Sequence, residues 1–153
     1  MLTIDVLHSI DRSVLCWLGT IDRDGMPNVS PKEVFCAHGS EGLLIANIAS
    51  PQSDRNIRGN PQVCVSFVDI FVQKGYKLKG RAEIVRPKSP RFSQLEVPLE
   101  QITQGLFPIR NIITVQVQTI EPIVAPSYHL MAGTTEASQI AGAMRAYGVK
   151  PDA

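Results

Sequence analysis

The side chains best suited to chemistry stand together in residues 47–61, NIASPQSDRNIRGNP. The apolar run at 43–46 before them predicts a buried strand. Ser50 is a favourable N-cap residue and Pro51 suits the first helical position, while Gly59 can end the helix. This pattern predicts a short helix that begins directly after a strand.

The first turn of that helix is a candidate phosphate site. Its backbone N–H groups have no partner within the helix, and Ser53, Arg55 and Asn56 follow them at once. Oriented donors, the positive end of the helix dipole and a guanidinium together favour a bound phosphate. The alternative is a well-capped connecting helix whose Arg55 is solvated.

A second polar patch, NVSPKEVF at residues 28–35, interrupts a strand-like segment. Because Pro31 cannot donate to a regular ladder, we expect a bulge or a free strand edge at this point. Backbone groups left free there could bond the edge of a planar heterocycle, with Lys32 supplying positive charge. Ordinary edge-strand polarity is the alternative explanation.

Length and charge limit the classes of function. The 153 residues suffice for a single domain, 1–153, with a core of its own. The 15 basic and 14 acidic residues are dispersed, which argues against a nucleic-acid partner. No apolar run is long enough to span a bilayer and the first residues do not resemble a secretory leader, so we expect a soluble, cytoplasmic protein without a membrane partner.

The sequence offers little for a metal site or a reactive nucleophile. The three cysteines lie in apolar, strand-like runs without a CxxC motif, and we interpret them as core thiols in a reducing compartment. A catalytic cysteine is the alternative. The three histidines are far apart and none has a ligand-spaced neighbour, so we expect no metal. None of the motifs G-x-S-x-G, GxGxxG and GxxxxGK[ST] occurs.

Hydrophobic periodicity predicts a mainly β protein with a few helices. The predicted helices cover 3–10, 51–59, 90–105 and 135–147. The predicted strands cover 13–21, 27–38, 43–47, 63–69, 73–85 and 112–120. Since most consecutive strands have no crossover helix between them, we expect a six-stranded antiparallel barrel and not a βαβ fold. Segment 127–153 is the part that these patterns determine least.

The order of these segments resembles a known family. The stretches LGTIDRDGMPNVSPKEVF, LLIANIAS, RNIRGNP, VCVSFVD and GYKLKGRAEIV follow one another as in the pyridoxamine 5′-phosphate oxidase-like family of FMN-binding split barrels. The resemblance covers residues 13–85 well and the remainder weakly. It implies a six-stranded antiparallel split barrel and a homodimer with FMN at the interface.

Carried over to matching positions, the resemblance implies contacts with the flavin. The ring would contact one strand and the end of the next at Ser30, Pro31, Lys32, Glu33, Asn47, Ile48 and Ala49. The phosphate would lie beside Gln52, Ser53, Arg55 and Asn56, and Lys77 would reach the flavin of the other subunit. The vitamin B6 oxidases usually place an Arg-Lys pair where this chain has Gln52-Ser53, which argues against pyridoxamine phosphate oxidation itself.

The resulting hypothesis is an FMN-dependent oxidoreductase acting on an unidentified small molecule. A deazaflavin, F420, is the alternative cofactor, since it also carries a tricyclic ring and a phosphate. A non-catalytic flavin- or haem-related binding or sensing protein on the same fold is the alternative function. A barrel that binds nucleic acid in the manner of OB-folds is disfavoured by the near-neutral charge.

Overall fold

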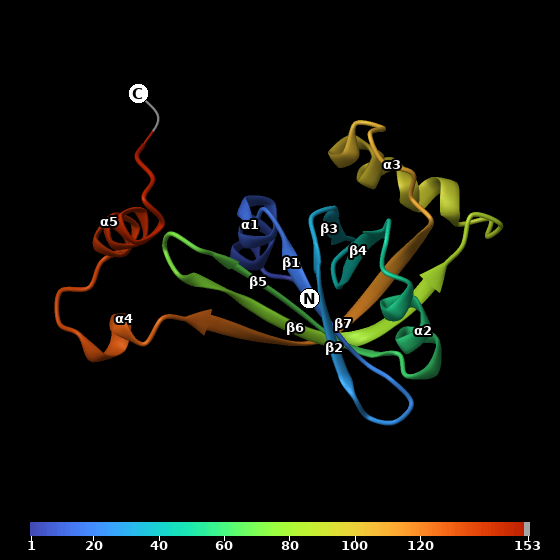
Figure 1. The fold of residues 1–153 in the computed structure, drawn as a ribbon, viewed down its shortest axis with the longest axis horizontal. Helices are drawn as coiled ribbons and strands as arrows, with labels where there is room; N and C mark the ends of the chain where they lie inside the picture. The colour runs from blue at the N-terminus through green and yellow to red at the C-terminus, as the bar shows by residue number, and fades with distance from the viewer. Residues whose placement is uncertain (152–153) are drawn as a thin grey trace.

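The computed structural model of the protein describes residues 1–151. Within them, seven strands form one antiparallel sheet that curls into a half barrel, with five helices around it (Figure 1). The helices are α1 (Ile4–Arg12), α2 (Pro51–Gly59), α3 (Phe92–Thr103), α4 (Ser127–Leu130) and α5 (Glu136–Tyr147). The strands are β1 (Cys16–Ile21), β2 (Pro27–Lys32), β3 (Phe35–His38), β4 (Gly42–Asn47), β5 (Gln62–Asp69), β6 (Lys74–Val85) and β7 (Asn111–Val124).

The strand order in the sheet is β2-β1-β5-β6-β7-β4-β3. Every neighbouring pair is antiparallel, as the sequence predicts. The mainly β split-barrel fold is thereby confirmed, but the predicted count of six strands is wrong by one. The prediction treated residues 27–38 as a single strand.

That segment divides at Glu33–Val34 into β2, which pairs with β1, and β3, which pairs with β4. These two strands lie at opposite edges of the sheet, so the two residues between them connect the edges of the curl. Val34 is buried, and its carbonyl oxygen accepts a hydrogen bond of 2.9 Å from the Ala46 N–H. Because β2 has only one neighbour, Pro31 stands on an edge strand, where a missing N–H donor is tolerated.

Local sequence rules account for most helix ends. Thr3 caps α1 by accepting from the Val6 N–H. Thr135 and Ser138 form a reciprocal capping box at the start of α5, and Gly148 ends that helix with φ 68°. The short α4 was not predicted, because four residues leave no helical periodicity to detect.

The core has two parts. The larger lies between α1 and the concave face of the sheet and includes Leu18, Val65 and Leu78, all fully buried. The smaller packs α3 against β4 and β7 through Leu99 and Ile112. No helix among the described residues combines the length and apolar character that a membrane crossing requires.

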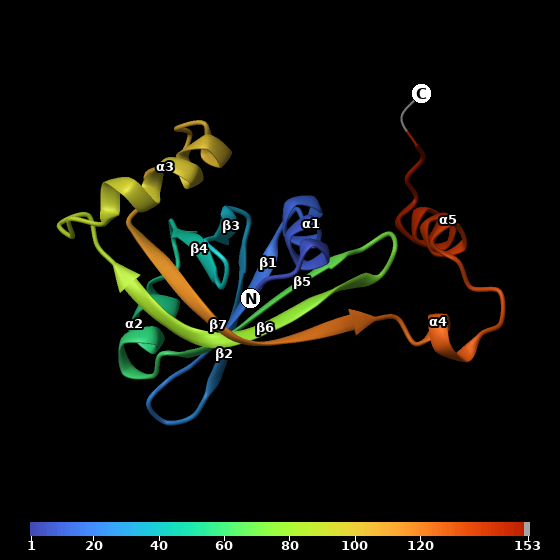
Figure 2. The ribbon, with the colours of Figure 1, turned by 180° about the vertical axis from the view of Figure 1, so that it is seen from behind.

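The C-terminal helices lie at the end of the molecule opposite α2 and α3 in both views (Figures 1 and 2). α5 packs beside the turn between β5 and β6: the rings of Tyr147 and Phe71 meet edge to face with centroids 6.3 Å apart. Lys74 and Glu136 form an ion pair of 2.8 Å. α4 and α5 therefore do not cover α2 of their own chain.

Gly80 allows β6 and β7 to approach closely where the sheet bends. The register of the two strands shifts between Lys79 and Gly80, and a Cβ atom on Gly80 would overlap the carbonyl oxygen of Gln116. The strands would then have to separate at the bulge.

We therefore expect Gly80→Ala to lower the free energy of unfolding by about 1–3 kcal/mol, the usual cost of overpacking. Gly142→Ala is the matched control, because its Cβ meets only an Arg145 guanidinium nitrogen at 3.9 Å. Because alanine favours a helix interior more than glycine does, Gly142→Ala in α5 should raise the free energy of unfolding by about 1 kcal/mol. Urea titration of both variants measures the two effects, and an unchanged midpoint for Gly80→Ala would contradict this account of the bend.

Candidate cofactor site

The first turn of α2 carries free donors. Ser50 occupies the N-cap position of α2, as predicted. The predicted capping hydrogen bond is wrong, because the Ser50 side chain makes no hydrogen bond to the helix. Its hydroxyl instead accepts from the Lys32 ammonium, and its N–H donates to Asn47 Oδ1 at 3.1 Å. Pro51 has no N–H and the Asp54 N–H donates to the Ser50 carbonyl at 3.3 Å, so the N–H groups of Gln52 and Ser53 are the ones that this turn leaves uncapped.

Two predicted phosphate residues hold α2 to the sheet. Ser53 is fully buried, with its hydroxyl 3.1 Å from that of Ser30 on β2. Asn56 is 2% exposed and donates to the Thr20 hydroxyl at 3.0 Å. A ligand at the surface would therefore meet the accessible part of this turn, Pro51 and Gln52, and not these two side chains.

Of the other two predicted phosphate residues, Gln52 is half-buried and Arg55 is exposed. The Gln52 amide donates to Asn56 Oδ1 at 2.7 Å, and its oxygen accepts from the Arg55 guanidinium. A pocket of about 360 Å³ opens between α2 and the β1–β2 turn. It is lined by Asp22, Arg23, Asp24, Gln52, Arg55, Asn56 and Arg58, and we call it the hairpin pocket. Three of the predicted phosphate residues thus meet there, together with Arg23 and Arg58.

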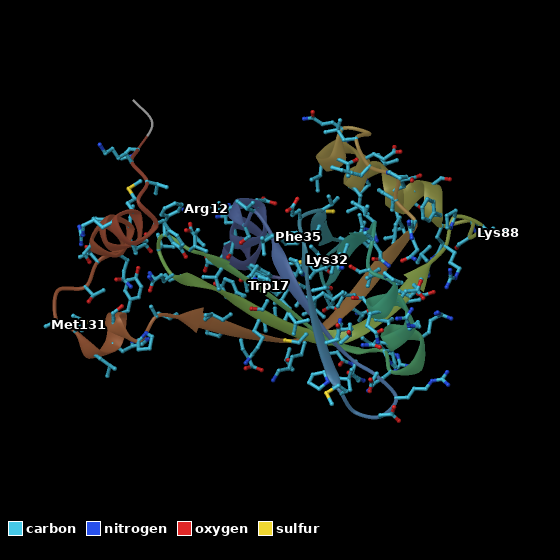
Figure 3. The ribbon with its side chains drawn as sticks, viewed as in Figure 1. Arg12, Trp17, Lys32, Phe35, Lys88 and Met131 are labelled. Carbon is cyan, nitrogen blue, oxygen red and sulfur yellow. The ribbon has the colours of Figure 1, made fainter. Side chains whose placement is uncertain are left out.

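β2 presents a free edge beside this helix. Ser30 and Lys32 turn their side chains inward, whereas Pro31 and Glu33 are exposed. Figure 3 shows Lys32 near the middle of the molecule, and only 5% of its surface is exposed. The predicted free strand edge at this segment is therefore confirmed, because β2 is an edge strand of the sheet.

The end of β4 contributes the other predicted ring contacts. Asn47 is buried, Ile48 is half-buried and Ala49 is exposed. The Asn47 amide donates to Asn111 Oδ1 at 3.1 Å, which joins β4 to the start of β7. This end of β4 leads directly into α2.

Lys77 lies apart from the other predicted residues. It is on the convex face of β6, where its ammonium is 2.7 Å from Glu121, and it lines neither pocket beside α2. Lys79 also contacts Glu121, at 2.6 Å. Hydrogen bonds from the two lysines lower the pKa of Glu121 to about 2. One chain alone does not bring Lys77 to the site.

Burial shifts the pKa values of two neighbouring side chains, Lys32 at the end of β2 and Cys16 at the start of β1. It lowers the pKa of Lys32 and raises the pKa of the Cys16 thiol to about 12, although the nearby Lys32 charge opposes the second shift. Cys16 is therefore a protonated, inert thiol, and the interpretation of this residue as a core cysteine is confirmed. Within residues 1–151 no three His, Cys, Asp or Glu side chains cluster as metal ligands would.

A second pocket of about 360 Å³ lies on the other side of α2, and sequence reasoning missed most of it. It is lined by Asn47, Ser50, Pro51, Asp54, Arg55, Arg58, Arg86, Arg110 and Asn111, and we call it the arginine pocket. Arg86 follows β6 and Arg110 precedes β7, so neither has a local spacing to α2 that a sequence pattern could reveal.

The fold is that of a split barrel, and the comparison with known families agrees. The profile of the family described as pyridoxamine 5′-phosphate oxidase matches residues 3–124. The chain belongs to that family. No curated protein sequence matches it significantly.

Three solved structures illustrate the range of proteins on this fold. An FMN-binding protein from Syntrophomonas wolfei shares 15% identity, with a TM-score of 0.65 over 77% of this chain and 86% of that one. HutZ, the haem storage protein of Vibrio cholerae, shares 20%, with a TM-score of 0.63 over 80% and 94%. An F420 reductase shares 26%, with a TM-score of 0.58 over 74% and 94%. At these identities the first two support the fold alone.

The buried charge of Lys32 should reduce stability at neutral pH. The unfolded chain keeps this proton up to the ordinary pKa near 10.5, while the folded chain releases it at lower pH. The unfolded state thus binds more protons in that interval, so the stability rises with pH between the two values.

We expect Lys32→Met to raise the free energy of unfolding at pH 7 on the order of 1 kcal/mol, with the gain shrinking as the pH approaches 10.5. Lys88→Met, at an exposed turn, is the control and should change nothing. Denaturant titrations at a series of pH values test this. A less stable Lys32→Met at pH 7 would mean that the bond to Ser50 outweighs the cost of burial.

Proposed function

We propose that this protein is an FMN-binding flavoprotein that acts as an oxidoreductase on a small molecule. The observation that carries the proposal is the juxtaposition, in a chain of this family, of the free edge of β2 with the uncapped first turn of α2. A planar ring needs in-plane hydrogen-bond partners along its edge, and a phosphomonoester needs N–H donors and positive charge. Here the two sets of partners stand side by side.

The phosphate would bind at the first turn of α2, on the side of the hairpin pocket. Arg55 would supply the guanidinium and Gln52 a neutral donor. Ser53 and Asn56 would act indirectly, because their hydrogen bonds to β2 and β1 fix the helix at the right distance from the strands. This arrangement replaces the missing Arg-Lys pair with an arginine one turn further along.

The ring would lie along Ser30–Glu33 and the end of β4. A bound FMN would supply the hydride or electron transfer itself. Lys32, buried beneath β2, would place a positive charge near the ring and favour its reduced, anionic form. Ile48 and Ala49 would supply packing surface at the turn into α2.

A second copy of the chain would complete the site. The outer face of β1 and β2 leaves Trp17 48% exposed, Ile21 37% and Val29 61%, an apolar surface that another subunit would cover. Trp17 and Ser66 lie opposite one another across β1 and β5, and Ser66 lies opposite Lys77 across β5 and β6, so Lys77 borders this surface. In such a homodimer Lys77 would reach the flavin of the partner. The three free cysteines suit a reducing compartment, and we place the protein in the cytoplasm.

The cofactor and the activity each have an alternative. The F420 reductase and the haem storage protein on this fold support a deazaflavin as cofactor, or a non-catalytic haem- or flavin-binding role. A deazaflavin would use the same strand edge and phosphate donors. A storage or sensing protein would bind its cofactor without turning over nicotinamide donors, oxygen or quinones.

The absorption spectrum of the purified protein, followed by cofactor extraction, distinguishes these cofactors. We expect the spectrum of bound oxidised flavin and FMN as the extracted species. A spectrum of deazaflavin or haem would select the corresponding alternative. Colourless protein that cannot be reconstituted with FMN would refute the flavin proposal.

Arg55→Ala should weaken FMN binding more than Lys77→Ala, because Arg55 holds the phosphate directly while Lys77 borders the ring of the other subunit. Loss of one charge-assisted phosphate contact predicts about a tenfold or greater rise in Kd. Fluorescence quenching of FMN on binding measures both values. Equal effects would contradict the placement of the phosphate beside Arg55.

A further inference from the structure

We propose that the arginine pocket is a second anion site beside the cofactor site, and that it binds a small ligand carrying a phosphate or pyrophosphate group. The two pockets share Arg55 and Arg58, whereas Arg86 and Arg110 line the arginine pocket alone. The flavin proposal uses the hairpin side of α2, whereas this pocket lies on the side that faces β7 and the end of β6. The proposal does not depend on which cofactor occupies the other side.

Guanidinium groups from three separate parts of the chain converge on this pocket. Arg55 and Arg58 come from α2, Arg86 from the segment after β6, and Arg110 from the residue before β7. One helix and two loops therefore supply positive charge to one volume of about 360 Å³. That size lies within the range of small-molecule sites and is too small for a macromolecule to enter.

The charges around the pocket do not balance. Its lining holds four arginines and one carboxylate, Asp54, which leaves three positive charges without a counterion in the free protein and two once Arg55 binds the FMN phosphate. Asp54 contacts Arg58 at 2.6 Å and Arg86 at 3.4 Å. Within residues 1–151, Arg55 and Arg110 have no acidic partner. A bound anion with two or more charges would relieve this repulsion.

The floor of the pocket is a buried, fully paired network. Asn47 and Asn111 are 3% and 5% exposed, and the amide of Asn47 donates to Asn111 Oδ1 at 3.1 Å. The Asn111 amide donates in turn to Asp54 Oδ2 at 3.0 Å. Because Asp54 is only 7% exposed, it is a fixed carboxylate that orients Arg58 and Arg86 toward the opening. The site is therefore built from the core outward and is not a chance meeting of surface side chains.

The chemistry of the lining indicates a phosphate group. Planar guanidinium forks match phosphate oxygens in pairs, and several forks around one centre suit a group with oxygens in three directions. Pro51 is the only residue in the lining with an apolar side chain, so the lining offers a ligand mainly polar and charged groups. Inorganic phosphate and pyrophosphate are thus suitable probes.

The test is a calorimetric titration of the full chain, saturated with FMN, with inorganic pyrophosphate. Arg110→Gln and Arg86→Gln remove two of the converging charges, and each should raise the Kd for pyrophosphate roughly tenfold. The Arg110 side chain forms no ion pair within residues 1–151, so its substitution breaks none. Arg81→Gln is the matched control, because it removes the same charge from the exposed face of β6 outside the pocket, and it should leave the Kd unchanged.

Three outcomes would overturn the second site. The first is no binding at millimolar pyrophosphate, and the second is an equal loss for Arg81→Gln, which would show a response to net charge alone. The third is a loss of FMN affinity in Arg110→Gln as large as in Arg55→Ala, which would make this pocket part of the cofactor site. If FMN fails to bind at all but the two pocket variants still weaken pyrophosphate binding, the flavin proposal fails and the second site stands.

Discussion

A buried chain of hydrogen bonds determines where α2 begins, and both pockets depend on it. The Lys32 ammonium donates to Ser50, the Ser50 N–H donates to Asn47, and Asn47 donates to Asn111, which donates to Asp54. These contacts join β2, the end of β4, the start of β7 and α2 itself. Because unpaired polar groups are costly in a dry interior, none of these residues can move without loss to its neighbours. The helix is therefore held rigidly with its first turn uncapped.

The curl of the sheet brings the parts of this network together. β2 and β3 stand at opposite edges although only Glu33 and Val34 separate them in the chain. The sheet must therefore close on itself until β4, with β3 at its side, comes to the inner face of β2. Gly80 contributes by admitting the carbonyl of Gln116 where a side chain would force β6 and β7 apart. The site is thus a consequence of closure: a flat sheet with the same strands would leave α2 without β2 beside it.

Several residues around α2 break rules that the rest of the chain obeys. Lys32 is a buried lysine with a lowered pKa, and the Ser50 side chain makes no capping hydrogen bond to α2. In the arginine pocket, the arginines outnumber the carboxylates. Each arrangement lowers the stability of the free protein, and a bound anion would offset that loss. Local departures of this kind, gathered in one place in an otherwise consistent fold, are expected at functional sites. Here they lie on both sides of a single helix.

The sequence by itself determined the elements, because caps, turns and periodicity act over a few residues. Alternation along residues 73–85 predicted β6, and the apolar run at 43–46 predicted the buried β4. The order of these segments was also enough to indicate the family. Only the tertiary structure decided that residues 27–38 divide between the two edges of the sheet. It also decided which polar groups meet: Ser50 pairs with Lys32, and Arg86 and Arg110 converge on α2. Those groups are far apart in the chain, and their approach depends on how the sheet closes, which no local spacing encodes.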